Sequence, residues 1–168
     1  MKRSKRRNLV SLAVGLMLLS GCVSTTDISK NSAFPTDFRL DQVYRTEVPL
    51  TIRIYHGPFS NLLQAVGPTS ANPLPKPEPP GSVWKNYQSY EVLPAGTEIQ
   101  ITELSIFYAP VDVGKQQILG TKIKSGRFAG QSIDISKICK TVPNDELNNG
   151  FGLYVRDRDI LTEEPSSR

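Results

Sequence analysis

Few side chains in this sequence could act as a nucleophile or as a general base. The chain has a single histidine, His56, and two cysteines, Cys22 and Cys139. A thiol and an imidazole can form a nucleophile–base pair, but neither Cys139 nor His56 stands in a motif that such enzymes use. Motifs for a nucleophilic serine, a phosphate-binding loop or a dinucleotide site are not found. We expect no cofactor and no metal site, because no further histidine or cysteine could complete one.

Two acidic pairs near the end of the chain could in principle cleave a glycosidic bond. They are Asp157 with Asp159 and Glu163 with Glu164. Such chemistry needs two carboxylates that face each other across a cleft. In the alternating stretch "RDRD", residues 156 to 159, charges of both signs are typical of a solvated face. We therefore rank an enzyme of unrecognised type last among three functional hypotheses.

Three aromatic residues are the most suggestive feature for binding. Trp84, Tyr87 and Tyr90 recur at intervals of three. In a helix the three would share a face, whereas on a strand Trp84 and Tyr90 would lie opposite Tyr87. Packing in the core is one interpretation. The other is an aromatic groove beside a proline-rich loop, suited to peptides or cell-wall fragments.

The N-terminus has the layout of a secretory signal. Five basic residues lie within the first seven positions, and an apolar run of eleven residues follows from Leu9 to Leu19. This run is too short for a membrane-spanning helix, which needs about 20 residues. The quartet "LSGC", ending at Cys22, resembles the lipobox of bacterial lipoproteins.

The lipoprotein resemblance covers about the first 22 residues and implies a modified N-terminus. Cys22 would carry diacylglycerol, the signal of residues 1–21 would be removed, and the new amino group would commonly be acylated. Two or three acyl chains make a durable membrane anchor. Val23 lacks the aspartate that holds many such lipoproteins in the inner membrane, so we expect a lipid anchor in the outer membrane, facing the periplasm.

Net charge gives no argument for a nucleic-acid partner. The chain carries 20 Lys and Arg against 16 Asp and Glu, but five of the basic residues lie in the signal, which leaves 15 against 16. A nucleic-acid surface requires a concentrated basic patch. We expect no nucleic-acid binding.

Cys139 would have no disulfide partner in its own chain if Cys22 is acylated. It ends the alternating stretch "SIDISKIC". The pattern favours a small buried residue with an inert thiol.

Alternation with a period of two predicts five or six short strands. Leu50, Ile52 and Ile54 form one apolar set, and further sets lie near residues 119–123, 133–135 and 151–155. In "GTEIQITELSIFY" the apolar phase slips by one residue near Thr102 and Glu103, which predicts a β-bulge. The stretches "PFSNLLQAV" and "PNDELNN" could each form a short helical turn, with Asn144 or Asp145 as a cap of the latter.

The mature chain is predicted to be one small domain. Residues 22–37 are polar and predict a flexible tether, and a single β domain is expected at residues 38–168. Within it, residues 67–82 hold six of the thirteen prolines and predict an exposed loop. The expected fold class is mainly β, either a small SH3-like barrel or a β-sandwich. Residues 83–138 weakly resemble bacterial SH3-like barrels in their strand and turn order.

Two functional hypotheses rank above enzymatic activity. The first is a lipid-anchored, non-enzymatic envelope protein that binds a protein partner or supports an envelope assembly. The second is a module that binds peptidoglycan or another carbohydrate, which rests on the aromatic residues and on the SH3-like resemblance.

Overall fold

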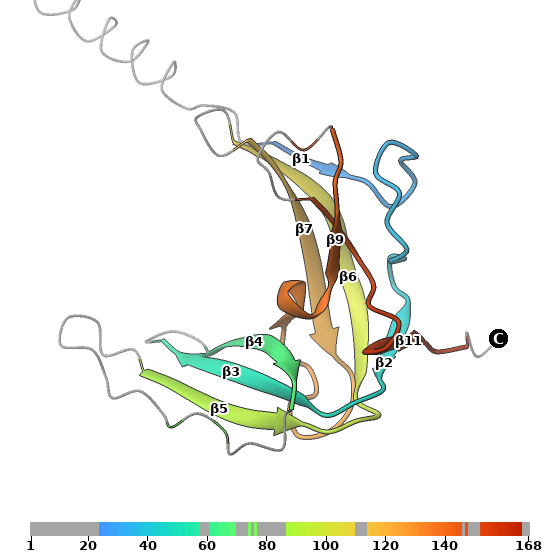
Figure 1. Ribbon diagram of the computed structural model, residues 1–168. Coiled ribbons are helices and arrows are strands. Elements are labelled where there is room, and N and C mark those ends of the chain that lie inside the picture. The colour runs from blue at the N-terminus through green and yellow to red at the C-terminus, as the bar shows by residue number, and fades with distance from the viewer. Residues whose placement is uncertain are drawn as a thin grey trace, which may run out of the picture.

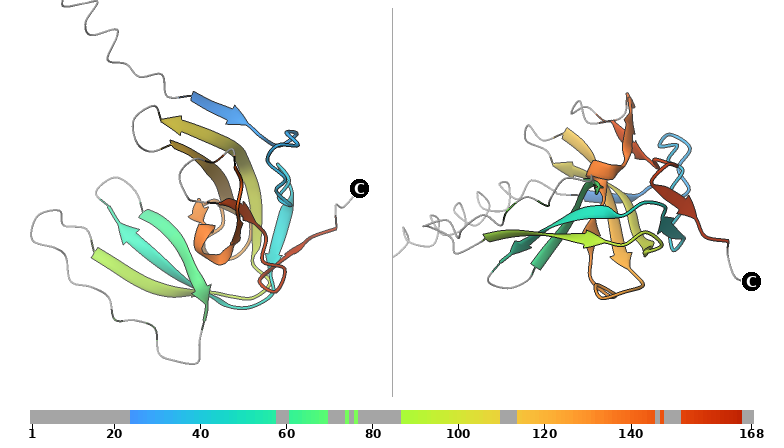
Figure 2. Two further views of the ribbon diagram at one scale, coloured as in Figure 1. Left: turned by 45° about the horizontal axis from the view of Figure 1, so that its top comes forward. Right: turned by 60° about the horizontal axis from the view of Figure 1, so that its bottom comes forward.

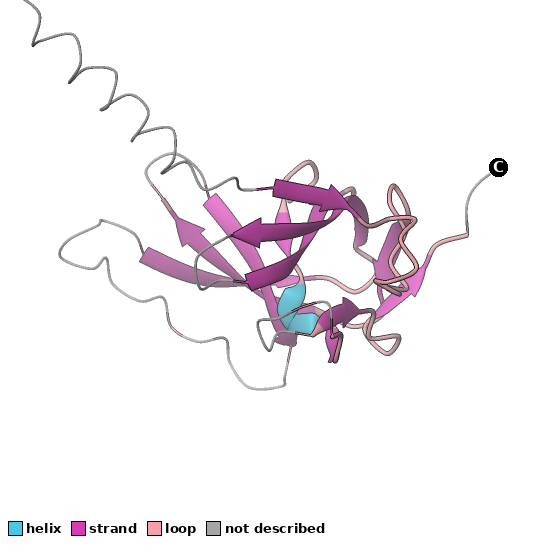
Figure 3. Ribbon diagram, turned by 90° about the horizontal axis from the view of Figure 1, so that it is seen from above, coloured by secondary structure: helices cyan, strands magenta, loops and turns pink. Residues whose placement is uncertain are grey.

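The computed structural model describes residues 24–57, 61–69, 74, 76, 87–109, 114–145, 147 and 152–165. As the sequence predicts, the fold is mainly β, although this part of the chain holds eleven strands instead of five or six. Several strands are too short to show alternation. The strands are β1 (Ser24–Asp27), β2 (Val43–Thr46), β3 (Leu50–His56), β4 (Asn61–Pro68), β5 (Tyr87–Leu93), β6 (Glu98–Ala109), β7 (Gly114–Ile123), β8 (Ile133–Asp134), β9 (Lys140–Val142), β10 (Leu153–Val155) and β11 (Leu161–Glu163). One 3-10 turn, η1 (Ser136–Ile138), precedes β9 (Figure 3).

The first sheet is built around the long strand β6. One edge of β6 pairs with β7 along its length, and the other edge pairs with β2 near its start and with β1 near its end. β11 adds to the far side of β2. The sheet curls into a half-barrel, visible in Figure 1 as the tall curved layer.

A β-bulge interrupts β6 where the sequence predicts one. The register with β7 shifts between Ile101 and Glu103, which turns the apolar phase back toward the core. Gly120 lies directly opposite Glu103, and a Cβ added to this glycine would come 2.6 Å from the Cβ of Glu103. The close approach of the two strands at the bulge therefore requires a residue without a side chain.

The second sheet has the order β5-β3-β4-β8 and forms a separate layer (Figure 2). As predicted, Leu50, Ile52 and Ile54 of β3 point into the core, with exposures of 0%, 0% and 4%. The helical turn expected at "PFSNLLQAV" is wrong for residues 61–66, because these belong to β4. Its register with β3 places Leu63 opposite Ile54, so non-local pairing decides the conformation of this ambiguous stretch.

One hydrophobic core lies between the two sheets. It takes side chains from the inner faces of both sheets and from the segment that contains η1. η1 lies against β4, and the residues before it, Ile133 and Ile135, are also buried. The short β9–β10 hairpin contributes Leu153, which has no exposed surface.

The tether expected at residues 22–37 is wrong for its described part, residues 24–37. β1 pairs with the end of β6, and the next residue, Ile28, is 1% exposed and donates its backbone N–H to the Leu104 carbonyl at 3.0 Å. Phe34 also packs against the core. Backbone pairing needs no apolar side chains, so the polar sequence of β1 gave no sign of it. The folded part therefore begins by Ser24, well before Phe38.

The predicted proline-rich loop begins later than expected. Gly67 and Pro68 belong to β4, and the N–H of Thr69 donates to the carbonyl of Pro49 at 2.8 Å. Apart from Leu74 and Lys76, the loop residues after Thr69 lie outside the described residues.

Candidate functional site

Cys139 and His56 each have partners that do not suggest catalysis. The Cys139 thiol is half-buried and donates to the Ile135 carbonyl at 3.3 Å. Burial raises the pKa of this thiol to about 12, with a smaller contribution from the nearby carboxylate of Asp134. A thiol with so high a pKa stays protonated at neutral pH and is a poor nucleophile. His56 shares a hydrogen bond of 2.7 Å with the Ser89 hydroxyl.

The first acidic pair belongs to a turn. Asp157 forms an ion pair with Lys140 at 3.0 Å, and this contact lowers the pKa of the Asp157 carboxyl. The same carboxylate accepts the backbone N–H of Asp159 at 3.1 Å. Asp157 is therefore held within its own turn and by Lys140 of β9.

The second acidic pair connects distant parts of the chain. Glu163 forms an ion pair with Arg39 at 3.2 Å, and Glu164 forms one with Arg45. Glu163 of β11 therefore contacts the segment before β2, and Glu164, just after β11, contacts β2 itself. Neither pair supports a catalytic role.

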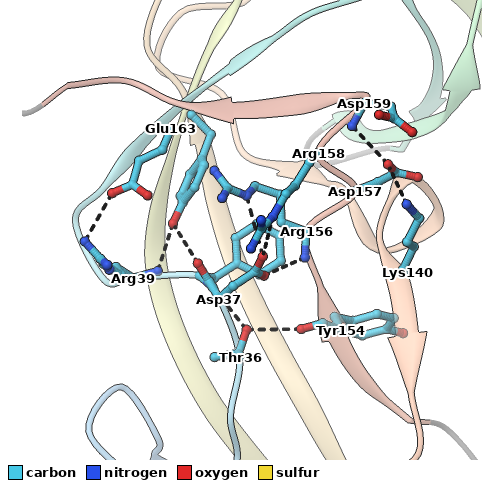
Figure 4. A network of polar contacts seen from close by, with 12 residues as sticks. Thr36, Asp37, Arg39, Lys140, Tyr154, Arg156, Asp157, Arg158, Asp159 and Glu163 are labelled. Atoms are coloured by element: carbon cyan, nitrogen blue, oxygen red, sulfur yellow. Dashed lines mark hydrogen bonds and ion pairs between the residues drawn. The ribbon is translucent and has the colours of Figure 1, made fainter.

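The stretch "RDRD" is not simply a solvated face. The Arg156 side chain is only 11% exposed, lies over the Tyr44 ring at 5.3 Å, and approaches the Asp37 carboxylate at 3.6 Å (Figure 4). The Asp37 carboxylate also accepts the backbone N–H of Arg156 at 2.7 Å, while Arg158 remains exposed. We call Asp37, Tyr44 and Arg156 the terminal network, because it joins the N-terminal part of the described fold to its C-terminal part.

Tyr44 lies at the centre of the terminal network and contacts the chain on several sides. Its hydroxyl accepts the backbone N–H of Arg39 at 3.0 Å and donates to the Asp37 carbonyl at 3.3 Å. Its ring meets Phe38 edge to face, with 5.4 Å between centroids. These bonds satisfy polar groups beside the core, which indicates a structural role for the network.

The structure separates the aromatic residues that the sequence singles out. Trp84 lies outside the described residues. Tyr87 and Tyr90 belong to β5, so the strand alternative holds for this pair. The register places Tyr90 opposite Arg53 and Tyr87 opposite His56, so the two positions belong to opposite faces of the sheet. The helical interpretation is wrong for these two residues.

Tyr90 belongs to an aromatic cluster that sequence reasoning missed. The guanidinium carbon of Arg53 lies 5.6 Å from the ring centroids of both Tyr90 and Tyr55, one on β5 and one on its own strand. Arg53 also donates to the Tyr55 hydroxyl at 2.8 Å, and this bond raises the pKa of the guanidinium above its ordinary value. Only cross-strand register brings Tyr90 to Arg53, so the sequence offered no direct signal.

The cluster is part of a mixed apolar and aromatic surface. Leu62 lies opposite Tyr55 on β4, and Val92 lies on β5 two positions from Tyr90, so both share the face of the cluster. Leu62 is 55% exposed and Val92 is 40% exposed. We call Arg53, Tyr55, Leu62, Tyr90 and Val92 the outer face of the second sheet.

A polar pair borders the outer face. Gln64 lies opposite Arg53 on β4 and donates to the Asp134 carboxylate on β8 at 2.7 Å. Burial alone would raise the pKa of Asp134, but hydrogen bonds from Gln64 and Ser136 hold it below its ordinary value. Asp134 is therefore ionised at neutral pH, so the border of the outer face carries a negative charge.

Neither a metal site nor a membrane helix is found in the part of the chain that the structure describes. No three His, Cys, Asp or Glu side chains there are grouped so that they could hold a metal ion. No helix among these residues has the length and apolar character needed to cross a membrane. The lipidation candidate, Cys22, lies outside the described residues.

Comparisons of this chain with models of known protein families, with curated proteins and with solved structures gave no match.

Proposed function

We propose that this protein is a lipid-anchored, non-enzymatic protein of the bacterial outer membrane that binds a protein partner in the periplasm. The outer face of the second sheet is the proposed binding surface. The single observation that carries this assignment is the stacking of Arg53 against Tyr55 and Tyr90 beside exposed Leu62 and Val92.

The anchor is supported by the sequence alone. The basic N-terminus, the apolar run and the quartet ending at Cys22 together match the lipoprotein pattern. Cys22→Ala should abolish incorporation of labelled fatty acid and leave the signal uncleaved. Cys139→Ser is the matched control, because it removes the other thiol and should leave labelling intact. Label that persists in Cys22→Ala would refute the anchor.

The residue types of the outer face fit a protein partner. Tyrosine and arginine are enriched among residues that dominate binding energy in protein interfaces. Arg53 is half-buried between rings, so its guanidinium is already oriented and loses little conformational freedom when a partner binds. A complementary partner would offer an acidic group to Arg53 and apolar side chains to Leu62 and Val92.

Crosslinking in living cells tests the surface. A photoreactive residue at Val92 should give a specific adduct with one envelope protein, whereas the same residue at Leu40, which is also 40% exposed but precedes β2, should not. Arg53→Ala should weaken the complex about 30-fold or more, as expected for an interface hot spot worth about 2 kcal/mol. Equal adducts at both positions, or an unchanged affinity, would contradict the assignment.

The tyrosines also allow a second function. Sugar rings bind aromatic faces, so Tyr55 and Tyr90, together with the SH3-like resemblance of residues 83–138, support binding to peptidoglycan. Co-sedimentation with purified cell wall separates the two functions. Sedimentation that is lost in Tyr90→Ala would favour peptidoglycan, and a protein that stays in solution would favour the protein partner.

A further inference from the structure

The end of the first sheet brings together three residues from three strands. Ser24, the first residue of β1, lies directly opposite Tyr108 of β6, and Tyr108 lies directly opposite Lys115 of β7. Opposed residues in antiparallel strands are about 4.5–5.5 Å apart between Cα atoms and share one face. The three residues therefore form a row across the end of the sheet, which we call the end row.

The end row lies next to the proposed lipid anchor. Cys22 precedes Ser24 by two residues, and two trans peptide units span at most about 7.6 Å between Cα atoms. β1 is held to β6 by its register from Ser24 to Asp27, so the chain after Ser24 offers no additional slack. An acylated Cys22 thus brings the end row to the headgroup region of the membrane.

The end row has chemistry that suits a lipid interface. Tyr108 is 43% exposed although the two preceding residues on its face, Ile106 and Leu104, are buried. Tyrosine is enriched at membrane interfaces because its ring is apolar and its hydroxyl is polar. Lys115 adds a basic side chain beside it, and basic residues are attracted to anionic lipids.

We propose that the end row, Ser24, Tyr108 and Lys115, lies against the anionic headgroups of the membrane that carries the anchor. This inference rests on the proposed lipidation of Cys22. The contact orients the domain: in Figure 1 and in the left view of Figure 2, β1 lies at one end of the molecule and β3, β4 and β5 lie at the other. The outer face of the second sheet is thereby directed away from the membrane and toward periplasmic partners.

Fluorescence of the full lipidated chain tests the contact. Tyr108→Cys is made in a Cys139→Ser background and labelled with a polarity-sensitive fluorophore, since the thiol of acylated Cys22 is blocked. The protein is reconstituted into vesicles of phosphatidylethanolamine and phosphatidylglycerol at three to one, with and without brominated acyl chains. Leu62→Cys in the same background is the control, because Leu62 is exposed on β4 in the other sheet.

We expect the label at position 108 to shift to shorter wavelength and to be quenched by brominated lipid at least about threefold more than the label at position 62. Equal quenching at the two positions, in protein that has incorporated fatty acid, would overturn the membrane contact and leave the anchor intact. Absence of fatty acid from the protein would refute the anchor itself, and the contact with it.

Discussion

Replacing Ile28 with alanine tests whether the segment before Phe38 belongs to the folded protein. Ile28 is 1% exposed, and its N–H donates to the Leu104 carbonyl. Alanine has three fewer side-chain carbon atoms than isoleucine, and the loss of their burial costs about 2.4 kcal/mol at about 0.8 kcal/mol each. The cavity left behind raises the expected loss in the free energy of unfolding to about 3 kcal/mol. This is a large share of the roughly 5–15 kcal/mol that stabilises a typical domain.

Urea denaturation of a chain that begins at Val23 measures this loss. With a slope of about 1–3 kcal/mol per molar urea, the midpoint should fall by about 1–3 M. Ser32→Ala is the matched control, because Ser32 is exposed in the same segment and its replacement should change stability by less than about 0.5 kcal/mol. If Ile28→Ala shifts the midpoint no more than the control, the segment is a tether and its assignment to the fold is refuted.

Three further predictions concern the bulge, acid stability and the thiol. Gly120→Ala should lower the free energy of unfolding by about 1–3 kcal/mol in urea melts, because its Cβ would collide with the facing strand, whereas Gly67→Ala, with nothing within 4 Å of the added atom, should not. If the two substitutions lower the free energy of unfolding equally, the strands at the bulge can move apart to accept a side chain, and the prediction is wrong. The pKa of Asp134 is lower in the folded protein than in the unfolded chain, so the ionised carboxylate stabilises the fold above about pH 3.9. This stabilisation is lost as the pH falls through the pKa of Asp134 in the folded protein. Asp134→Asn should therefore lower the free energy of unfolding at pH 7 and make that free energy fall less steeply in acid. An unchanged dependence of the free energy of unfolding on pH would contradict this prediction. Because burial raises the pKa of Cys139 to about 12, iodoacetamide should modify it slowly at pH 8 in the native protein and quickly in urea; rapid native labelling would show an accessible thiolate.

Sequence patterns were informative where one strand carries enough alternating residues. Leu50, Ile52 and Ile54 defined the inner face of β3, and the phase slip near Thr102 located the bulge, because a period of two leaves no other way to keep both halves of β6 facing the core. The mainly β class followed from these features. Adjacent Leu62 and Leu63 gave no clear period, so β4 was mistaken for a helical turn.

What the sequence could not reveal depends on contacts between distant residues. The burial of Arg156 depends on Tyr44, and the cluster around Arg53 depends on the register of β3 with β5. Neither charge pattern nor periodicity encodes such register. The sequence therefore predicts the candidate surface only in part: it points to Tyr90 but gives no sign of the partners of Tyr90, Arg53 and Tyr55.

The pairing of β2 with β11 has a consequence for the order in which the protein can fold. The side chain of Gln42, just before β2, donates to the Glu164 carbonyl, 122 positions along the chain. The proposed N-terminal signal implies export with the N-terminus first, so β2 crosses the membrane long before its partner β11. Contacts of such long range close late and slow folding. Until β11 has crossed, β2 has an open edge that can pair with other chains, so the exported intermediate would be exposed to aggregation and to any periplasmic chaperone that binds strand edges.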